Sequence, residues 1–201
     1  MAGPIDFYFE FASPYGYLAS TQIDRIAERF GREVRWHPVM LGAAFKQTGM
    51  RPLAQIPLKG PYMMHDLPRF ARLLGVPFTA PPVLPDNSLH ASRATVWLDE
   101  TRGPEAAKRL ARAILQAHWA EGREIGHPEL VAEIAAGQGI DREELIAAVA
   151  EPAIKERLKE RTQASIERGV FGSPFVIVDE EPFWGADRLP QVVTWLERGG
   201  W

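Results

Sequence analysis

The 201-residue sequence contains no cysteine. This absence excludes structural disulfides, thiolate ligands for zinc or iron–sulfur clusters, and redox chemistry by thiols of the protein itself. A predominance of basic residues is also lacking, because 23 Lys and Arg are set against 26 Asp and Glu and the two signs are interleaved. A nucleic-acid partner requires a basic face, so we expect none.

Long hydrophobic runs are equally absent. No stretch approaches the roughly 18 apolar residues that a membrane span requires, and the first apolar run is interrupted by Asp6 and Glu10. The start Met-Ala-Gly-Pro lacks the basic residues that open a signal peptide. We therefore expect a soluble cytoplasmic protein with no membrane partner. The five histidines show no metal-binding spacing, and we expect no metal site.

The chain opens with the pattern of a buried strand that leads directly into a helix. Residues 5–11 are mostly apolar and aromatic, which is typical of a buried strand. Ser13 and Pro14 follow, and these residue types are favoured at an N-cap and at the first helical position. The apolar spacing predicts one helix that continues to Phe30. Ser13 is thus predicted beside unpaired helix N–H groups, a place that favours anions.

A second strand is predicted at residues 34–40, parallel to the first and at the edge of the sheet, because Pro38 cannot donate to a neighbour. Glycine and proline then interrupt residues 41–61, which we expect to form a long loop. Lys46 and Lys59 are the candidate anion contacts of this loop.

An all-helical block follows the loop. Asp141 with Glu144 three residues later has the spacing of a capping box. Gly and Pro mark the ends and starts of helices, and apolar residues recur at helical spacing between them. These signals predict helices at residues 66–74, 88–102, 104–118, 128–136, 142–150 and 152–168.

The chain then returns to β-structure. Residues 175–178 are apolar and β-branched, residues 179–182 predict a turn, and residues 183–184 begin the return strand of a hairpin. A closing helix is expected at residues 189–198, with Asp187 as its N-cap.

Without the helical block, the order of elements is the βαβ…αββα order of the thioredoxin fold. We therefore predict an α/β protein with a thioredoxin-like domain of residues 1–40 and 152–201. Residues 41–151 would form a connecting loop and a large all-helical insertion domain. In this fold the first strand–helix junction, Ser13-Pro14, meets the loop before the third strand, Ser173-Pro174.

Three segments carry a resemblance to a known family: Glu10–Tyr17 (EFASPYGY), Phe171–Phe175 (FGSPF) and Phe183–Leu189 (FWGADRL). They resemble the 2-hydroxychromene-2-carboxylate isomerases, which belong with the kappa-class glutathione transferases to the superfamily of the disulfide oxidoreductase DsbA. The resemblance covers essentially the whole chain, including the helical insertion. It implies a glutathione-dependent isomerase of aromatic hydrocarbon catabolism, with an aromatic carboxylate as substrate and a homodimer as assembly.

The resemblance also implies roles for particular residues. Glutathione would be the cofactor that supplies the thiolate, and Ser13 would donate a hydrogen bond to it. Pro174 would be a cis-proline that leaves the backbone of Ser173 free to pair with the cysteinyl part. Asp187 would bind the ammonium group of the γ-glutamyl end. The segment that holds this end would consist of Trp184, Gly185, Ala186, Asp187 and Arg188.

The implied reaction is an isomerisation in which the bound thiolate adds to the ring-opened substrate and later leaves. Addition converts a conjugated double bond into a single bond that can rotate, and expulsion of the thiolate yields trans-o-hydroxybenzylidenepyruvate.

The substrate side of the site departs from the family's pattern. Lys46 matches a family lysine that would meet the substrate carboxylate, and Asp86 lies where substrate or the glycyl end of glutathione is held. Family members can carry Asn at the position of Met50 and polar residues near Leu53, Ala54 and Asp86. This sequence is apolar at the first three positions and acidic at the last, so the identity of the substrate stays open.

Other functions remain in view. A kappa-like glutathione S-transferase that conjugates electrophiles would use the same Ser13. A catalytically inactive thioredoxin-like module would bind a partner through the cis-proline loop. From the residues alone, Ser13 also fits a plain helix cap and Asp187 a plain N-cap. A serine hydrolase is disfavoured because Ser13 is not in a G-x-S-x-G motif.

Overall fold

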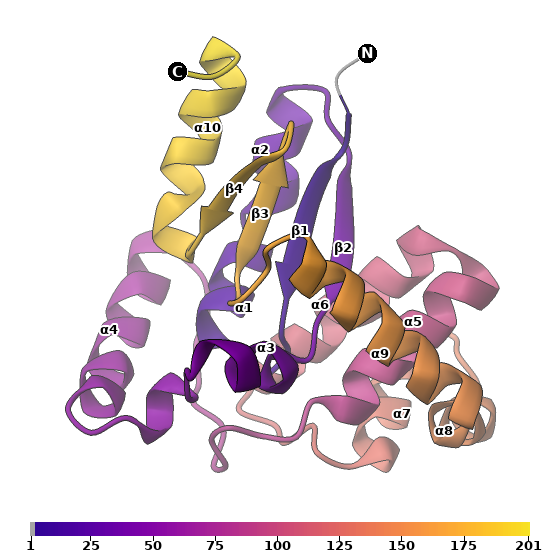
Figure 1. The fold of residues 1–201 in the computed structure, drawn as a ribbon. Coiled ribbons are helices and arrows are strands. Elements are labelled where there is room, and N and C mark those ends of the chain that lie inside the picture. The colour runs from indigo at the N-terminus through magenta and orange to yellow at the C-terminus, as the bar shows by residue number, and fades with distance from the viewer. Residues whose placement is uncertain (1–2) are drawn as a thin grey trace.

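A four-stranded mixed sheet lies at the centre of the fold (Figure 1). The computed structural model of the protein describes residues 3–201. The strand order is β2-β1-β3-β4, in which β1 (Ile5–Phe9) is parallel to β2 (Val34–Pro38) and antiparallel to β3 (Phe175–Val178). β4 (Glu181–Trp184) pairs antiparallel with β3. This sheet confirms the predicted thioredoxin-like α/β fold, with β2 at the edge.

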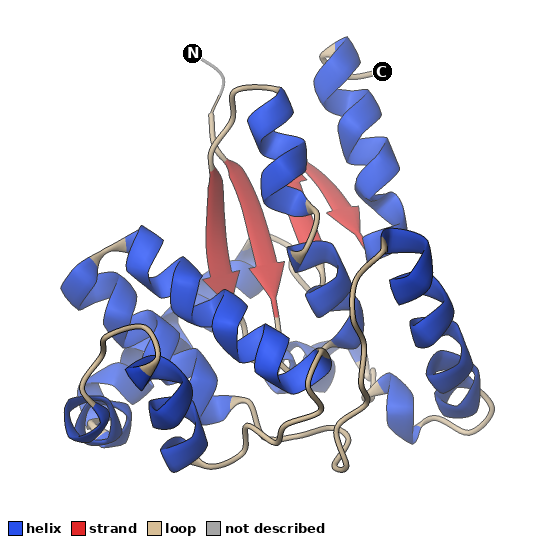
Figure 2. Ribbon diagram, turned by 180° about the vertical axis from the view of Figure 1, so that it is seen from behind, coloured by secondary structure: helices blue, strands red, loops and turns tan. Residues whose placement is uncertain are grey.

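Successive side chains of a strand point to opposite sides of the sheet. Four of the five residues of β1 are buried, so both faces of this strand are covered. Phe7 and Phe9 belong to the larger core cluster, which includes residues of α1 (Pro14–Ser20), α2 (Ile23–Arg29) and α10 (Leu189–Arg198). Figure 2 shows these helices in front of the sheet.

On the opposite face of the sheet lie α3 (Leu41–Thr48) and α9 (Pro152–Glu167) (Figure 1). Tyr8 points to this side and packs in a second cluster with Leu41 and Phe175. The sheet therefore has a helical layer on each face, as the thioredoxin-like order requires.

The first helix is shorter than the sequence predicted. Instead of one helix to Phe30, the structure has α1 and α2 with a break at Thr21 and Gln22. The hydroxyls of Ser20 and Thr21 donate to the carbonyls of Tyr17 and Leu18, each at 2.7 Å. Such local hydroxyl–carbonyl bonds compete with the helical ladder, and α1 accordingly has only seven residues.

Residues 41–61 contain more helix than predicted. α3 occupies the first part, a 3₁₀ turn covers Leu53–Gln55, and α4 (Lys59–Leu74) begins seven residues before the predicted start at residue 66. The carboxylate of Glu10 accepts a hydrogen bond from the first amide of α3, Leu41 N, at 2.8 Å. This partner is distant in sequence, so the local pattern of glycine and proline could not reveal it.

The predicted helical block is confirmed. Asp141 caps α8 by accepting from Glu144 N at 2.9 Å. Besides α4 and α9, the helices predicted in this part of the chain are α5 (Leu89–Arg102), α6 (Pro104–Trp119), α7 (Pro128–Ala136) and α8 (Arg142–Ala150). Residues of these helices share one buried cluster with Phe7 and Phe9 of the sheet. A single core therefore continues from the sheet into the insertion.

The C-terminal hairpin is tighter than predicted. The turn consists of Asp179 and Glu180, which have φ values of 50° and 68°, and β4 already begins at Glu181. A 3₁₀ turn at Ala186–Arg188 connects β4 to α10. No helix among residues 3–201 is long and apolar enough to cross a membrane.

Candidate functional site

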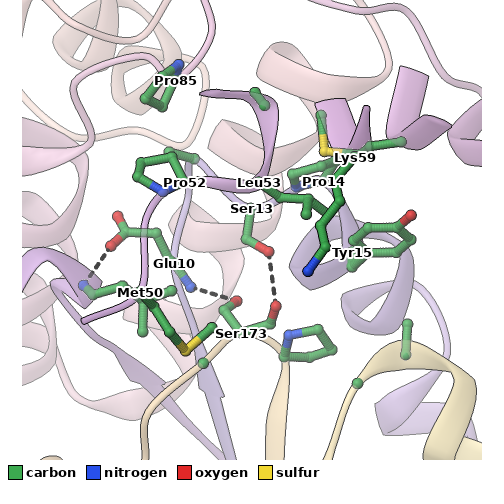
Figure 3. A pocket seen from close by; sticks show the side chains of 18 of the residues that line it. Glu10, Ser13, Pro14, Tyr15, Met50, Pro52, Leu53, Lys59, Pro85 and Ser173 are labelled. Atoms are coloured by element: carbon green, nitrogen blue, oxygen red, sulfur yellow. Dashed lines mark hydrogen bonds between the residues drawn. The ribbon is translucent and has the colours of Figure 1, made fainter. Parts of the chain in front are cut away.

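A cavity of about 860 Å³ lies beyond the carboxyl end of β1, between the cis-proline loop, α3 and the start of α4 (Figure 3). The structure brings all residues that were predicted to hold glutathione to this one cavity. They are Ser13, Ser173, Pro174, Trp184, Gly185, Ala186, Asp187 and Arg188. Their common location follows from the sheet order, because β1, β3 and β4 are neighbours.

Ser13 occupies the N-cap of α1. Its backbone is extended, with φ −97° and ψ 111°, as favoured for a residue before proline. Its Oγ accepts from Gly16 N at 3.1 Å and donates to the carbonyl oxygen of Ser173 at 3.0 Å (Figure 3). The hydroxyl therefore caps a helix and also joins the two loops that the fold brings together.

The loop before β3 is fixed from both sides. The Ser173–Pro174 peptide bond is cis, as predicted. Ser173 Oγ accepts from Glu10 N at 2.9 Å, and the carbonyl of Pro174 accepts from Gly185 N at 3.0 Å. A Cβ added to Gly16 would lie 2.7 Å from Ser173 Oγ, so the close approach of α1 to this loop requires glycine.

The segment after β4 forms one side of the cavity. The indole of Trp184 lies against Gly172 and edge-to-face with Phe171, with ring centroids 4.8 Å apart. Asp187 is exposed and pairs with Arg188 at 3.0 Å, and its side chain does not cap α10. The expectation of a plain N-cap at Asp187 was therefore wrong, and its carboxylate is accessible from the cavity.

Two predicted substrate contacts do not line the cavity. Lys46 lies in the last turn of α3 and is not among the lining residues. The carboxylate of Asp86 accepts from Asn87 N at 2.7 Å and from Ile125 N at 2.6 Å. Asp86 thus holds two stretches of backbone together, a role that its position in the sequence does not reveal.

Basic residues other than Lys46 lie on the wall of the cavity. Lys59 and Arg51 line the cavity, and Figure 3 shows the Lys59 side chain extending from the start of α4 toward Ser13 and Tyr15. The sequence indicated Lys59 only as one of two lysines in a supposed loop. Its position at a helix start on the cavity wall depends on the fold of residues 53–61, which was not predicted.

Tyr15 and Asp66 form a polar pair that sequence reasoning missed. The hydroxyl of Tyr15 donates to Asp66 Oδ2 at 2.8 Å, which ties α1 to α4 at the cavity wall. Burial and the hydrogen bond to Asp66 raise the pKa of Tyr15 well above its ordinary value. This hydroxyl therefore stays protonated and serves as a fixed donor.

The remaining wall of the cavity is largely apolar. Met50, Leu53 and Ala54 lie on it, as expected from the family's substrate positions. The other apolar side chains of this wall are Leu41, Phe45, Ile56, Met63, Phe70, Leu84 and Trp119. The indole Nε1 of Trp119 donates to the carbonyl of Phe11 at 2.8 Å, so α6 is fastened to the end of β1.

Glu10 is a buried acid at the cavity. Its carboxylate accepts hydrogen bonds from Leu41 N and Ser88 Oγ. Burial, only partly offset by these hydrogen bonds, raises the pKa of Glu10 to about 7. Among residues 3–201, no group of three or more His, Cys, Asp or Glu side chains could hold a metal ion.

Comparison with known proteins places this fold and site in context. A family model described as a DSBA-like thioredoxin domain matches residues 4–197. A 2-hydroxychromene-2-carboxylate isomerase from Sphingobium xenophagum is 33% identical, over 98% of this chain and 99% of that protein. Glutathione S-transferase kappa 1 from Caenorhabditis elegans is 27% identical, over 96% and 91% of the two chains. A solved 2-hydroxychromene-2-carboxylate isomerase superposes with a TM-score of 0.88 at 29% identity, over 96% of this chain and 94% of that one.

The sheet order, the cis-proline loop and the cysteine-free strand–helix junction define a DSBA-like thioredoxin-fold protein without a redox thiol of its own. Within this class, the chain belongs to the family of the 2-hydroxychromene-2-carboxylate isomerases. The resemblance carried by the three sequence motifs is thereby confirmed.

The buried Glu10 predicts a pH dependence of stability. The folded protein keeps the Glu10 proton up to about pH 7, whereas the unfolded chain releases it near the ordinary pKa of 4.5. The free energy of unfolding should therefore fall as the pH rises from 4.5 to 7, by on the order of 3 kcal/mol. Urea titrations of the wild type and of Glu10→Gln at several pH values would measure this, and Glu10→Gln should flatten the decline.

Glu143→Gln, at an exposed position on α8, is the matched control and should leave the pH dependence unchanged. A decline of equal size in Glu10→Gln and the wild type would show that another group causes it.

Proposed function

We propose that the protein is a glutathione-dependent isomerase that acts on 2-hydroxychromene-2-carboxylate or a related aromatic carboxylate. The observation that carries the proposal is the hydroxyl of Ser13, 3.0 Å from the backbone oxygen of Ser173 at the cavity, in a chain without cysteine. A hydroxyl donor beside a peptide edge suits a thiol peptide, because the ligand brings the sulfur and the protein stabilises its thiolate. The kappa-class glutathione transferase relative supports this choice of cofactor.

In the proposed complex, the cysteinyl part of glutathione pairs with the backbone of Ser173 as an added strand. Its γ-glutamyl end lies at the segment after β4, where Asp187 takes the ammonium group and Arg188 assists with the carboxylate. Of the two cations Lys59 and Arg51 that line this part of the cavity, we assign Lys59 to the carboxylate of the glycyl end, because its side chain extends toward Ser13.

The chemistry requires one bond to form and then to break. The sulfur lone pair forms a C–S bond with the β-carbon of the conjugated substrate, and the displaced π electrons move to the carbonyl oxygen as an enolate. The former double bond is now single and rotates. When the enolate re-forms its carbonyl, the C–S bond breaks and the thiolate leaves, so glutathione is regenerated. Ser13 acts throughout by donating to the sulfur, which needs no base.

The apolar wall around Met50, Leu53 and Ala54 favours a second candidate function. A conjugating glutathione transferase would use the same thiolate but would keep the C–S bond, and an apolar wall accommodates many uncharged electrophiles. The isomerase remains the better-supported function because the isomerase relative is the more similar of the two compared. A purely structural thioredoxin-like module, by contrast, would not bind glutathione, which calorimetry measures directly.

Ser13→Ala tests the central residue. The cap loss should cost roughly 1 kcal/mol of stability, whereas the pKa of bound glutathione should rise by roughly one to two units because a hydrogen bond to a charged group is lost. The ultraviolet absorbance of the thiolate during a pH titration measures this pKa. Ser20→Ala, which removes a hydroxyl on the same helix that bonds Tyr17 O, is the control. An unchanged pKa in Ser13→Ala would remove Ser13 from the mechanism.

Lys59→Met should weaken glutathione binding roughly tenfold, because a charge-assisted contact to the glycyl carboxylate is lost. Lys46→Met removes the same charge one helix away, outside the cavity, and should leave the dissociation constant within roughly twofold. Isothermal titration calorimetry on both variants measures the difference. Equal losses in the two variants would contradict the assignment of Lys59 to the ligand.

Met50→Asn should shift the preference between substrates. A polar side chain on the apolar wall should raise the ratio of kcat/KM for 2-hydroxychromene-2-carboxylate over that for an uncharged aryl halide by roughly tenfold. Met64→Asn is the matched control, since Met64 is 38% exposed, as Met50 is 37% exposed, but does not line the cavity. A ratio that moves equally in both variants would show that the wall does not select the substrate.

A further inference from the structure

The hydroxyl of Ser13 already donates its hydrogen bond within the ligand-free protein. A serine hydroxyl has one hydrogen to donate, and Ser13 donates it to the carbonyl oxygen of Ser173. Its oxygen accepts from Gly16 N at 3.1 Å. While this arrangement persists, Ser13 has no hydrogen left for the sulfur of a ligand.

The partner of Ser13 is the carbonyl that an added strand would use. Within residues 3–201, the hydrogen bond recorded for the Ser173 carbonyl is the one from Ser13. The Ser173 side chain is occupied elsewhere, because its Oγ accepts from Glu10 N at 2.9 Å. A peptide that pairs with the backbone here would present an amide N–H to the same oxygen. The ligand N–H thus satisfies the oxygen to which Ser13 donates, and the ionised sulfur is then a stronger acceptor for the Ser13 hydroxyl than this already paired carbonyl.

We propose that the amide N–H of the bound thiol peptide displaces the Ser13 hydroxyl from the Ser173 carbonyl, and that the released hydroxyl then donates to the ligand sulfur. This inference rests on the proposed use of glutathione. The exchange keeps every group paired, because the ligand N–H satisfies the carbonyl while the hydroxyl hydrogen rotates about the Cβ–Oγ bond. The oxygen of Ser13 does not have to move, so its bond from Gly16 N is retained.

The consequence is selectivity among thiols. A thiol without an amide donor at the cysteinyl nitrogen cannot release Ser13, and its sulfur therefore receives no hydrogen bond. A thiol peptide with that amide releases the hydroxyl and is ionised. The protein thus recognises the peptide backbone of its cofactor before it activates the sulfur, which restricts activation to γ-glutamyl-type thiol peptides.

The experiment compares two ligands that differ in one atom group. In an ester analogue of glutathione, an ester oxygen replaces the N–H that joins the γ-glutamyl and cysteinyl parts. Thiolate absorbance is titrated against pH for each ligand, free and at saturation, with the wild type and with Ser13→Ala. The wild type should lower the thiol pKa of glutathione by roughly one unit more than that of the ester. In Ser13→Ala the two ligands should show equal shifts.

Equal lowering of both thiol pKa values by the wild type would overturn the exchange, because the hydroxyl would then reach the sulfur without an amide donor. It would leave the proposed function intact. If wild-type protein binds glutathione but does not lower its thiol pKa, the exchange and the role of Ser13 both fail. If glutathione does not bind at all, the proposed function itself fails.

A second measurement tests the exchange without the ester analogue, in case that analogue binds too weakly for the titration. S-methyl glutathione keeps the amide but has no ionisable sulfur, so it displaces the Ser13 hydroxyl and offers only a weak acceptor in return. Ser13→Ala has no such bond to break and should bind S-methyl glutathione roughly fivefold more tightly than the wild type. Equal or weaker binding by Ser13→Ala would show that no bond is displaced.

Discussion

The architecture of the site depends on Glu10, the residue that directly follows the end of the central strand. Its backbone N–H donates to Ser173 Oγ, and its carbonyl accepts from Ser13 N at 3.0 Å. Its buried carboxylate accepts from Leu41 N and from the hydroxyl of Ser88. One residue therefore fixes the cis-proline loop, the start of α1, the start of α3 and the approach to α5. A buried acid without a cation is costly, and this one is retained where four segments must meet.

The absence of cysteine changes how such a site can work. In a thiol enzyme the protein must stabilise its own sulfur anion, whereas under the proposed function the anion arrives with the ligand and leaves with it. The protein needs only donors in fixed positions, and a serine N-cap is already such a donor. Since α1 has seven residues, the direct hydrogen bond of Ser13 is a stronger basis for this stabilisation than the dipole of a long helix would be.

Local sequence signals predicted the parts of the fold that depend on local physics. The Ser13-Pro14 cap, the N-cap at Asp141 and the edge strand that contains Pro38 all follow from backbone preferences of individual residues, and the structure contains each of them. The residues that the motifs assigned to glutathione binding all line one cavity, while their roles stay predictions. Of the elements that were wrong, the break after α1 depends on local hydroxyl–carbonyl bonds, whereas α3 depends on a distant partner. α3 begins at an amide paired with Glu10, 31 residues away in sequence.

On the substrate side, the sequence could not show which individual side chains face the cavity. Asp86 resembled a ligand contact, but its two carboxylate oxygens accept from backbone amides, one of them 39 residues away. A carboxylate that is satisfied by amides cannot be distinguished from a free one in a sequence. The resemblance likewise assigned Lys46 to the substrate, whereas the fold of residues 41–61 places Lys59 and not Lys46 on the cavity.

The two sides of the cavity are built differently, and this difference bears on how the function can diverge. The side proposed to hold glutathione uses the backbone of Ser173 together with side chains on the short connections next to the strands, such as Ser13 and Asp187, and the sheet constrains these connections. The opposite wall uses side chains such as Met50, Leu53 and Phe45, carried by the segment between β2 and α4. Substitution of these side chains changes shape and polarity without disturbing the sheet. Under the proposed function, this architecture therefore allows the thiolate chemistry to stay the same while the molecule that the thiolate attacks changes.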